Sequence, residues 1–114
     1  MNLQVEQPNH TTAILHLNGR LDASTQEAVK NIWLSEEQLK YIIADMANTT
    51  FIDSLGMAAL VSGMKAVRTR AGDFYIVNPG EVVRLLLELT RMDAVFRVVA
   101  TVEEALQTIT AHES

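Results

Sequence analysis

One stretch of this chain carries more information than the rest: Thr49-Thr50-Phe51-Ile52-Asp53-Ser54-Leu55-Gly56-Met57-Ala58-Ala59-Leu60-Val61. It places a serine, Ser54, where a strand ends and a helix begins, because apolar residues recur at helical spacing after it. A hydroxyl at such a junction faces solvent and lies at the positive end of the helix. Ser54 is therefore the residue whose role has to be explained first.

Two interpretations of Ser54 follow from local physics. A helix N-terminus has unpaired N–H groups and stabilises a nearby anion by roughly 0.3–1 kcal/mol. Phosphorylation of Ser54 would add about 1.5 to 2 negative charges beside Asp53, so the helix would favour the phosphate and the carboxylate would oppose it. The other interpretation is that Ser54 simply caps the helix, which spacing alone favours.

Composition and length indicate one soluble globular domain over residues 1–114. The chain is 48% hydrophobic and 20% charged, and it contains no cysteine, which excludes disulfides and thiolate chemistry. No run of about 18 apolar residues and no secretory leader pattern is present. We expect a cytoplasmic protein, a monomer or weak dimer, with no membrane span and no cofactor.

The charge of the chain argues for a protein partner. The formal net charge is −5, whereas a nucleic-acid binder needs clustered Lys and Arg on one face. Lys65, Arg68 and Arg70 do fall together near the end of one expected helix. We interpret them as a solvated helix end that complements the dipole rather than as a binding patch.

Hydrophobic periodicity predicts an α/β fold with an opening β-hairpin, then helices and strands in alternation, a mixed and mostly parallel sheet and about four helices. The expected strands are Leu3–Glu6, Thr12–Leu17, Tyr41–Met46, Asp73–Val77 and Val95–Val99. The expected helices run over residues 23–34, from 54 to about 71, over 81–90 and from 101 onward. Tyr41–Met46 is almost continuously apolar, which is typical of a central strand covered on both faces.

Helix ends and faces can also be predicted. Asp22 or Ser24 should cap the first helix, and Thr101 should pair with Glu104 in a capping box, while residues 112–114 should fray. The expected inward residues of the first helix are Ala28, Val29, Ile32 and Trp33, and those of the third are Val82, Leu85, Leu86 and Leu89. The second helix should turn inward Met57, Leu60, Val61, Met64 and Val67.

Small residues are unusually frequent on the helix that follows Ser54: Gly56, Ala58, Ala59, Ser62 and Gly63. Glycine costs about 1 kcal/mol relative to alanine within a helix, so its presence needs a reason. Small side chains allow another element to approach closely. Close packing inside the fold is the default explanation, and approach of another chain is the alternative.

Two motifs resemble those of a known family, the STAS-domain anti-sigma factor antagonists. The first is Phe51-Ile52-Asp53-Ser54-Leu55-Gly56-Met57, which is similar to the family signature whose phosphorylatable serine follows an aspartate. The second is Leu17-Asn18-Gly19-Arg20-Leu21-Asp22-Ala23-Ser24-Thr25, which resembles the segment that joins the second strand to the first helix. The expected order of elements agrees with this family over nearly the whole chain.

The resemblance implies a function and a set of site residues. The unmodified protein would bind an anti-sigma factor with serine-kinase activity and release a sigma factor for transcription, and phosphorylation would abolish binding until a serine phosphatase reversed it. Ser54 would be the phosphoacceptor. The implied partner-binding residues are Asp22, Ser24, Asp53, Leu55, Gly56 and Met57.

The chain departs from the family pattern at Leu55. Many members have a second serine or threonine there, so Ser54 is the single hydroxyl at this position of the motif. If Leu55 is exposed, it becomes an apolar anchor for a partner.

Other functions fit the sequence less well. A receiver domain would need an acidic pair after its first strand to hold magnesium, and the chain lacks that pair. A serine hydrolase would need a base near its nucleophile, but His10, His16 and His112 are scattered, which also disfavours a metal site. We therefore expect no catalytic activity. The serious alternative is a noncatalytic STAS module that binds a different kinase, a phosphatase or a scaffold.

Overall fold

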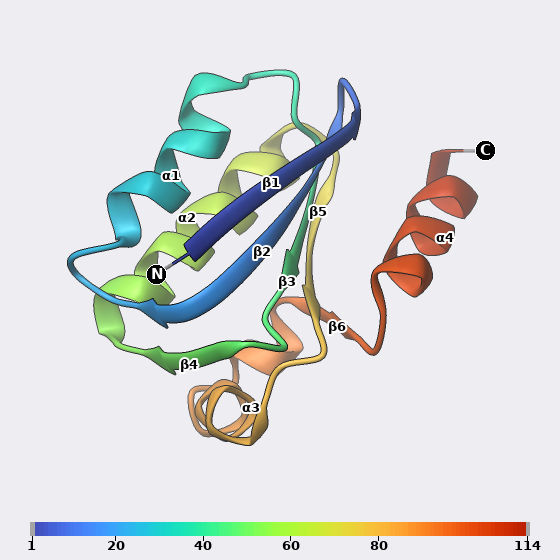
Figure 1. Ribbon diagram of the computed structural model, residues 1–114. Coiled ribbons are helices and arrows are strands. Elements are labelled where there is room, and N and C mark those ends of the chain that lie inside the picture. The colour runs from blue at the N-terminus through green and yellow to red at the C-terminus, as the bar shows by residue number, and fades with distance from the viewer. Residues whose placement is uncertain (1, 114) are drawn as a thin grey trace.

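A computed structural model describes residues 2–113 of the chain. Five strands form the sheet in the order β1-β2-β3-β5-β6, and β4 pairs with the end of β2 (Figure 1). The strands are β1 (Asn2–Asn9), β2 (Thr12–Leu21), β3 (Tyr41–Asp45), β4 (Thr49–Ile52), β5 (Asp73–Val77) and β6 (Arg97–Val99). The helices are α1 (Gln26–Ser35), α2 (Ser54–Thr69), α3 (Glu81–Leu89) and α4 (Val102–Glu113), with a 3₁₀ turn at Met92–Ala94.

The predicted fold class is confirmed. The β1–β2 pair is antiparallel and forms the opening hairpin, whereas the pairs β2–β3, β3–β5 and β5–β6 are parallel. β3 lies at the centre of the sheet, and Tyr41 through Ala44 are buried, as its apolar sequence predicts. None of the helices within residues 2–113 is long and apolar enough to cross a membrane.

Two hydrophobic layers cover the two faces of the sheet. Figure 1 shows α1 and α2 on one side and α4 on the other, with α3 beyond the end of the sheet. The larger layer lies under α1, α2 and α3 and includes Trp33, Leu60, Phe74 and Leu87. The smaller layer lies under α4 and joins Ile14, Tyr41, Ile43, Tyr75, Val77, Ala105 and Ile109.

Glycines on α2 allow the close packing of the larger layer. Gly56 lies against the backbone of Leu21, since a Cβ on Gly56 would be 2.2 Å from the Leu21 carbonyl oxygen. A Cβ on Gly63 would be 2.8 Å from the Phe74 ring and 3.1 Å from Trp33. Packing inside the fold, the default explanation for these two small residues, is therefore correct, and Trp33 belongs to the core.

The segment between β3 and Ser54 differs from the simple alternation that the sequence predicts. A separate strand, β4, follows β3 after a short turn and pairs in parallel with the last residues of β2. The predicted strand Val95–Val99 is shorter, because the 3₁₀ turn and Phe96 precede β6. These short segments carry too few residues for periodicity to assign them.

Two predicted helix faces need correction. α3 buries Val83 and Leu87, whereas Val82, Leu85 and Leu89 are exposed. Six of its nine residues are apolar, so two faces of the helix look alike and the sequence pattern selects the wrong one. On α1, Ala28 is exposed, while Val29, Ile32 and Trp33 pack against the core.

The C-terminal helix keeps its predicted cap. Thr101 Oγ1 accepts a hydrogen bond from the Glu104 N–H (3.0 Å), and the Glu104 carboxylate accepts one from the Ala100 N–H (3.1 Å). His112 and Glu113 belong to the helix, and Ser114 lies outside the described residues, so fraying of this end stays a prediction.

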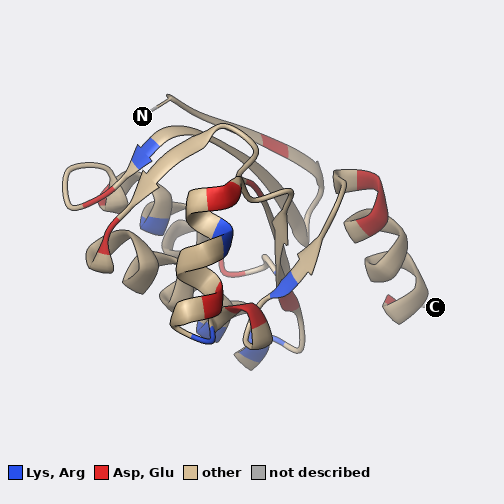
Figure 2. Ribbon diagram, turned by 90° about the horizontal axis from the view of Figure 1, so that it is seen from below, with Lys and Arg blue, Asp and Glu red and all other residues tan. Residues whose placement is uncertain are grey.

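Within the basic group at the end of α2, Lys65 and Arg68 are exposed as expected, whereas Arg70 is structural rather than solvated. Arg70 donates hydrogen bonds to the carbonyl oxygens of Trp33, Glu36 and Leu39 and so holds the chain between α1 and β3. Arg68 pairs with Asp73 at 3.2 Å. Figure 2 shows that Lys and Arg are dispersed over the elements rather than gathered on one face.

We predict that Gly56→Ala destabilises the protein, although alanine favours a helix by about 1 kcal/mol. The added methyl group would collide with the Leu21 carbonyl, and α2 would have to move away from β2. We expect the free energy of unfolding, measured with urea, to fall by about 1–3 kcal/mol. Gly80→Ala is the matched control, because a Cβ on Gly80 meets nothing within 4 Å, and it should change stability by less than about 1 kcal/mol. Equal effects of the two substitutions would contradict the steric explanation.

A second prediction concerns pH. His16 lies between Asp45, 3.0 Å from Nδ1, and Glu6, 3.4 Å from Nε2. Burial disfavours the charged ring, but hydrogen bonds to the two carboxylates outweigh burial and raise the pKa of His16 above its ordinary 6.5. This ion-pair stabilisation is therefore complete below pH 6.5 and is lost as pH rises through the raised pKa. Urea unfolding of wild type and His16→Gln should differ most at mildly acidic pH, and a difference that grows toward pH 9 would contradict the assignment.

Candidate phosphorylation and partner-binding site

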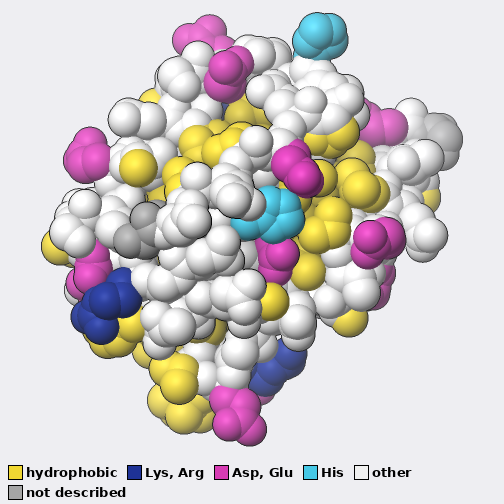
Figure 3. All heavy atoms as spheres, viewed as in Figure 1, with side chains coloured by type: hydrophobic (Ala, Val, Ile, Leu, Met, Phe, Trp, Pro, Cys, Tyr) yellow, Lys and Arg dark blue, Asp and Glu magenta, His cyan; other side chains and the backbone are white. Residues whose placement is uncertain are grey.

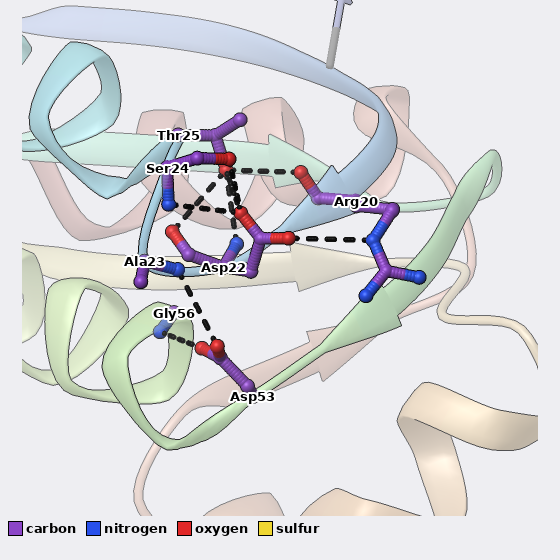
Figure 4. Close-up of polar contacts among 7 residues, drawn as sticks. All are labelled: Arg20, Asp22, Ala23, Ser24, Thr25, Asp53 and Gly56. Atoms are coloured by element: carbon purple, nitrogen blue, oxygen red, sulfur yellow. Dashed lines mark hydrogen bonds and ion pairs between the residues drawn. The ribbon is translucent and has the colours of Figure 1, made fainter.

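Asp53 fixes the start of α2. Its Oδ1 accepts a hydrogen bond from the Gly56 N–H at 2.8 Å, which makes Asp53 the N-cap of the helix. Its Oδ2 accepts a hydrogen bond from the Ala23 N–H at 3.4 Å, in the loop after β2 (Figure 4). One carboxylate thus connects the helix to this loop. The capping role considered for Ser54 belongs to Asp53.

Ser54 is the first residue of α2, and its side chain is exposed. Its hydroxyl makes no hydrogen bond with any residue between 2 and 113, in contrast to the Asp53 carboxylate beside it. The first N–H groups of a helix have no partner in a preceding turn, so they remain available near this hydroxyl. The serine is free to react, and the helix end favours negative charge at that place.

Asp22 organises the loop between β2 and α1. Its Oδ1 accepts hydrogen bonds from the Ser24 hydroxyl (2.7 Å) and the Ser24 N–H (3.0 Å), and Oδ2 accepts one from Arg20 Nε (3.3 Å). The hydrogen bond from the Ser24 hydroxyl is the main reason why the pKa of Asp22 is lowered, and the Arg20 guanidinium adds to it. Asp22 is therefore ionised at neutral pH.

The predicted cap of α1 is wrong. The helix begins at Gln26, and Thr25 rather than Asp22 or Ser24 is its N-cap residue. The Asp22 carboxylate bonds within its own turn, so it is not available to the helix. Thr25 Oγ1 instead accepts a hydrogen bond from the Asp22 N–H at 2.9 Å.

Arg20 and Phe51 form a contact that sequence reasoning missed. The Arg20 guanidinium lies 4.0 Å from the centroid of the Phe51 ring, a cation–π arrangement between β2 and β4. Pairing of these strands brings the two residues together. No local pattern could have revealed the contact, because it depends on the position of β4.

Ser54 lies at one end of an apolar groove between α2 and α3. The nearer part has a volume of about 290 Å³. It is lined by Ile52, Asp53, Ser54, Met57, Leu86 and Thr90. A second part of about 580 Å³ extends along α2 past Val61 to Lys65, with Met92 on its other side. The sequence placed Met57 near Ser54 but could not predict the contribution of α3.

The predicted contact residues differ in their exposure. Leu55 is 45% exposed, which meets the condition for an apolar anchor. Met57 is half-buried and lines both parts of the groove. Gly56 is buried against Leu21, so the expectation that it lies at the surface is wrong. Its small size serves the packing of α2 on β2.

The surroundings of Ser54 contain neither a histidine partner nor a metal-binding cluster within residues 2–113. None of the histidine side chains within residues 2–113 hydrogen-bonds Ser54, and His16 is engaged by Glu6 and Asp45. Among the same residues, no group of three His, Asp or Glu side chains is arranged to hold a metal ion. A phosphate on Ser54 would meet the N-terminus of α2 on one side and the Asp53 carboxylate on the other.

Comparison with known proteins agrees with this geometry. A family model described as the STAS domain matches residues 2–105. The anti-sigma F factor antagonist of Paenibacillus polymyxa is 25% identical over 117 residues, covering 99% of this chain and 97% of that protein.

Two solved structures share the fold. SpoIIAA, an anti-sigma factor antagonist, in its unphosphorylated form has a TM-score of 0.87 at 23% identity and covers 96% of this chain and 97% of its own. The Bacillus cell fate determinant SpoIIAA in its phosphorylated form has a TM-score of 0.76 at 22% identity, covering 95% and 99%. At this level of identity the structures establish the fold alone. Because the family model spans most of its length, the chain belongs to the STAS domain family, and its resemblance to the anti-sigma factor antagonists of that family is confirmed.

Proposed function

We propose that this protein is an anti-sigma factor antagonist of the cytoplasm that is switched by phosphorylation of Ser54. The unphosphorylated form binds an anti-sigma factor with serine-kinase activity, which frees a sigma factor for transcription. The kinase phosphorylates Ser54 and ends the complex, and a serine phosphatase restores the binding form. The proposed contact residues are Asp22, Ser24, Asp53, Leu55 and Met57.

The observation that carries this proposal is the state of the Ser54 hydroxyl. It is exposed and unbonded within the described chain, while Asp53 satisfies the helix cap in its place. Phosphorylation therefore removes no hydrogen bond that the fold needs. The protein can remain folded in both states, which a reversible switch requires.

The groove explains how a phosphate would act on a partner. Its nearer part is lined mainly by apolar side chains, and Leu55 is exposed beside it. A doubly charged group at Ser54 would have to be desolvated against any partner seated there. It would also repel acidic partner residues next to Asp53. Binding should therefore weaken without a change of fold.

The relatives support the same proposal. The relative from Paenibacillus polymyxa is an anti-sigma F factor antagonist. SpoIIAA has been solved in unphosphorylated and phosphorylated forms, so a protein of this fold exists in both states. The alternative function is a noncatalytic STAS module for another kinase, a phosphatase or a scaffold, and it predicts no phosphate transfer from any anti-sigma kinase of the same proteome.

We predict that Ser54→Ala abolishes phosphorylation by the cognate kinase and leaves stability nearly unchanged. Asp53 caps α2, so loss of the Ser54 hydroxyl should change the free energy of unfolding by less than about 0.5 kcal/mol. The chain is incubated with ATP and each anti-sigma serine kinase of its proteome, and phosphate is located by mass spectrometry. Thr50→Ala, which removes an exposed hydroxyl on β4, is the control and should remain a substrate. Phosphate on the Ser54→Ala variant would refute the assignment.

We also predict that Leu55→Ala weakens partner binding about fivefold or more, because truncation of a buried interface anchor costs above about 1 kcal/mol. Leu34→Ala is the matched control, since Leu34 is also an exposed leucine (63%) but lies on α1. The affinity of the Leu34→Ala variant for the kinase, measured by calorimetry, should differ from that of wild type by less than twofold. Ser54→Asp should weaken binding through added charge. Equal losses for the two leucine variants would argue against a partner surface at the start of α2.

A further inference from the structure

A small, partly open cavity lies between the sheet and the last turns of α4, on the other face of the sheet from α2. Its volume is about 90 Å³, which exceeds several times the space that one water needs. The lining residues are Tyr41, Gly72, Asp73, Tyr75, Arg97, Thr108 and His112. Tyr41 and Asp73 begin their strands, so the cavity is at the opposite end of these strands from Asp45 and Val77. Hydrophobic side chains on the face seen in Figure 3 are interrupted by acidic and polar ones.

The hydroxyl of Tyr41 makes no hydrogen bond of normal geometry, and its contact with the Glu113 carboxylate is at most a weak one. Tyr41 is 1% exposed, and among residues 2–113 its oxygen is the one buried side-chain N or O atom left unpaired. Buried polar groups in folded proteins are nearly always paired, so an unpaired one requires an explanation. Tyr75 lines the same cavity and also makes no side-chain hydrogen bond within the described residues.

The cavity offers more donors than acceptors. Asp73 is its carboxylate, and that group already accepts hydrogen bonds from Arg97 Nε (2.6 Å), Arg68 Nε (3.2 Å) and the Phe74 N–H (2.8 Å). The terminal nitrogens of Arg97 make no hydrogen bond with residues 2–113. Burial raises the pKa of Tyr41 to about 12, with the nearby Glu113 carboxylate adding to it, so this hydroxyl remains a donor at neutral pH.

Among the residues that line the cavity, the Arg97 guanidinium and the Asp73 carboxylate form an ion pair. Arg68 and Arg97 face one carboxylate, Asp73, and Lys40 lies 3.8 Å from Glu113. Arg68, Lys40 and Glu113 lie outside the lining of the cavity. The Tyr41 and Tyr75 hydroxyls and the terminal nitrogens of Arg97 are donors without a protein acceptor of normal geometry among the described residues, and they favour a ligand that supplies acceptor oxygens.

We propose that this cavity binds a small oxyanion of the phosphate class, held by the hydroxyls of Tyr41 and Tyr75 and the guanidinium of Arg97. The oxyanion would pair the buried Tyr41 hydroxyl and connect β3, β5 and β6 beneath α4. The source is free phosphate or the terminal group of a phosphomonoester. This site does not depend on the proposed role of Ser54, which lies at the start of α2.

Glu113 is the rival acceptor for Tyr41, because its carboxylate lies close enough to raise the pKa of the hydroxyl. If Glu113 were the intended partner, its removal would destabilise the protein and bound phosphate would have no effect. If the oxyanion is the partner, Glu113→Gln should strengthen phosphate binding by removing a negative charge from the site. The two possibilities thus predict opposite results for one variant.

The experiment measures thermal unfolding and calorimetric binding of the full chain in phosphate-free buffer, with inorganic phosphate, glycerol 3-phosphate or chloride added at equal ionic strength. Phosphate at ten times its Kd should raise the Tm by about 5 °C relative to chloride. Tyr41→Phe and Arg97→Gln should each weaken phosphate binding about tenfold or more. Arg84→Gln, with the same charge change on the exposed face of α3, is the control and should bind as wild type.

Two results would overturn the proposal. One is a Tm that responds to phosphate and to chloride alike, and the other is equal phosphate affinity in wild type and Tyr41→Phe. Tyr41→Phe keeps the ring and removes an unpaired buried hydroxyl, so in chloride its Tm should equal or exceed that of wild type. Tighter binding of glycerol 3-phosphate than of inorganic phosphate would identify a phosphomonoester as the source, and the reverse order would identify the free ion.

Discussion

The carboxylate of Asp53 is the interaction on which the site depends. It binds the N–H of Gly56 with one oxygen and the N–H of Ala23 with the other, and so joins the start of α2 to the loop after β2. The same helix end lies against Leu21, where only a hydrogen at the Gly56 Cα fits. Cap and close contact together position Ser54, and neither uses its hydroxyl.

Separation of the cap from the proposed phosphoacceptor has a functional consequence. A serine that capped its own helix would lose a structural hydrogen bond on phosphorylation. Here the neighbouring aspartate caps the helix, and the serine projects to solvent beside an apolar groove. The two faces of the sheet also differ, because α2 and the groove are on one face, whereas α4 and its polar cavity are on the other. A ligand under α4 and a partner at Ser54 would therefore not compete for the same surface.

Long periodic segments were predictable because their patterns are local. The central strand, the inward face of α2 and the capping box at Thr101 all follow from residues within a few positions of one another. The inward face of α3 was not predictable in this way. Apolar residues lie on both of its sides, so Val82 and Val83 look equivalent until β4 is in place. The predicted cap of α1 was wrong for a related reason. The Asp22 carboxylate accepts hydrogen bonds from Ser24 within its own turn, and the sequence alone does not show whether it does this or caps the helix.

The sequence by itself determined the fold class, the family resemblance and the position of Ser54 at a strand-to-helix junction, because hydrophobic period and short motifs are properties of neighbouring residues. Only the tertiary structure decided that Asp53 is the cap, that Gly56 is buried and that α3 completes the groove. It also revealed the unpaired hydroxyl of Tyr41. These features depend on atoms that come together from distant parts of the chain, and their hydrogen bonds and steric contacts exist only after the sheet has formed.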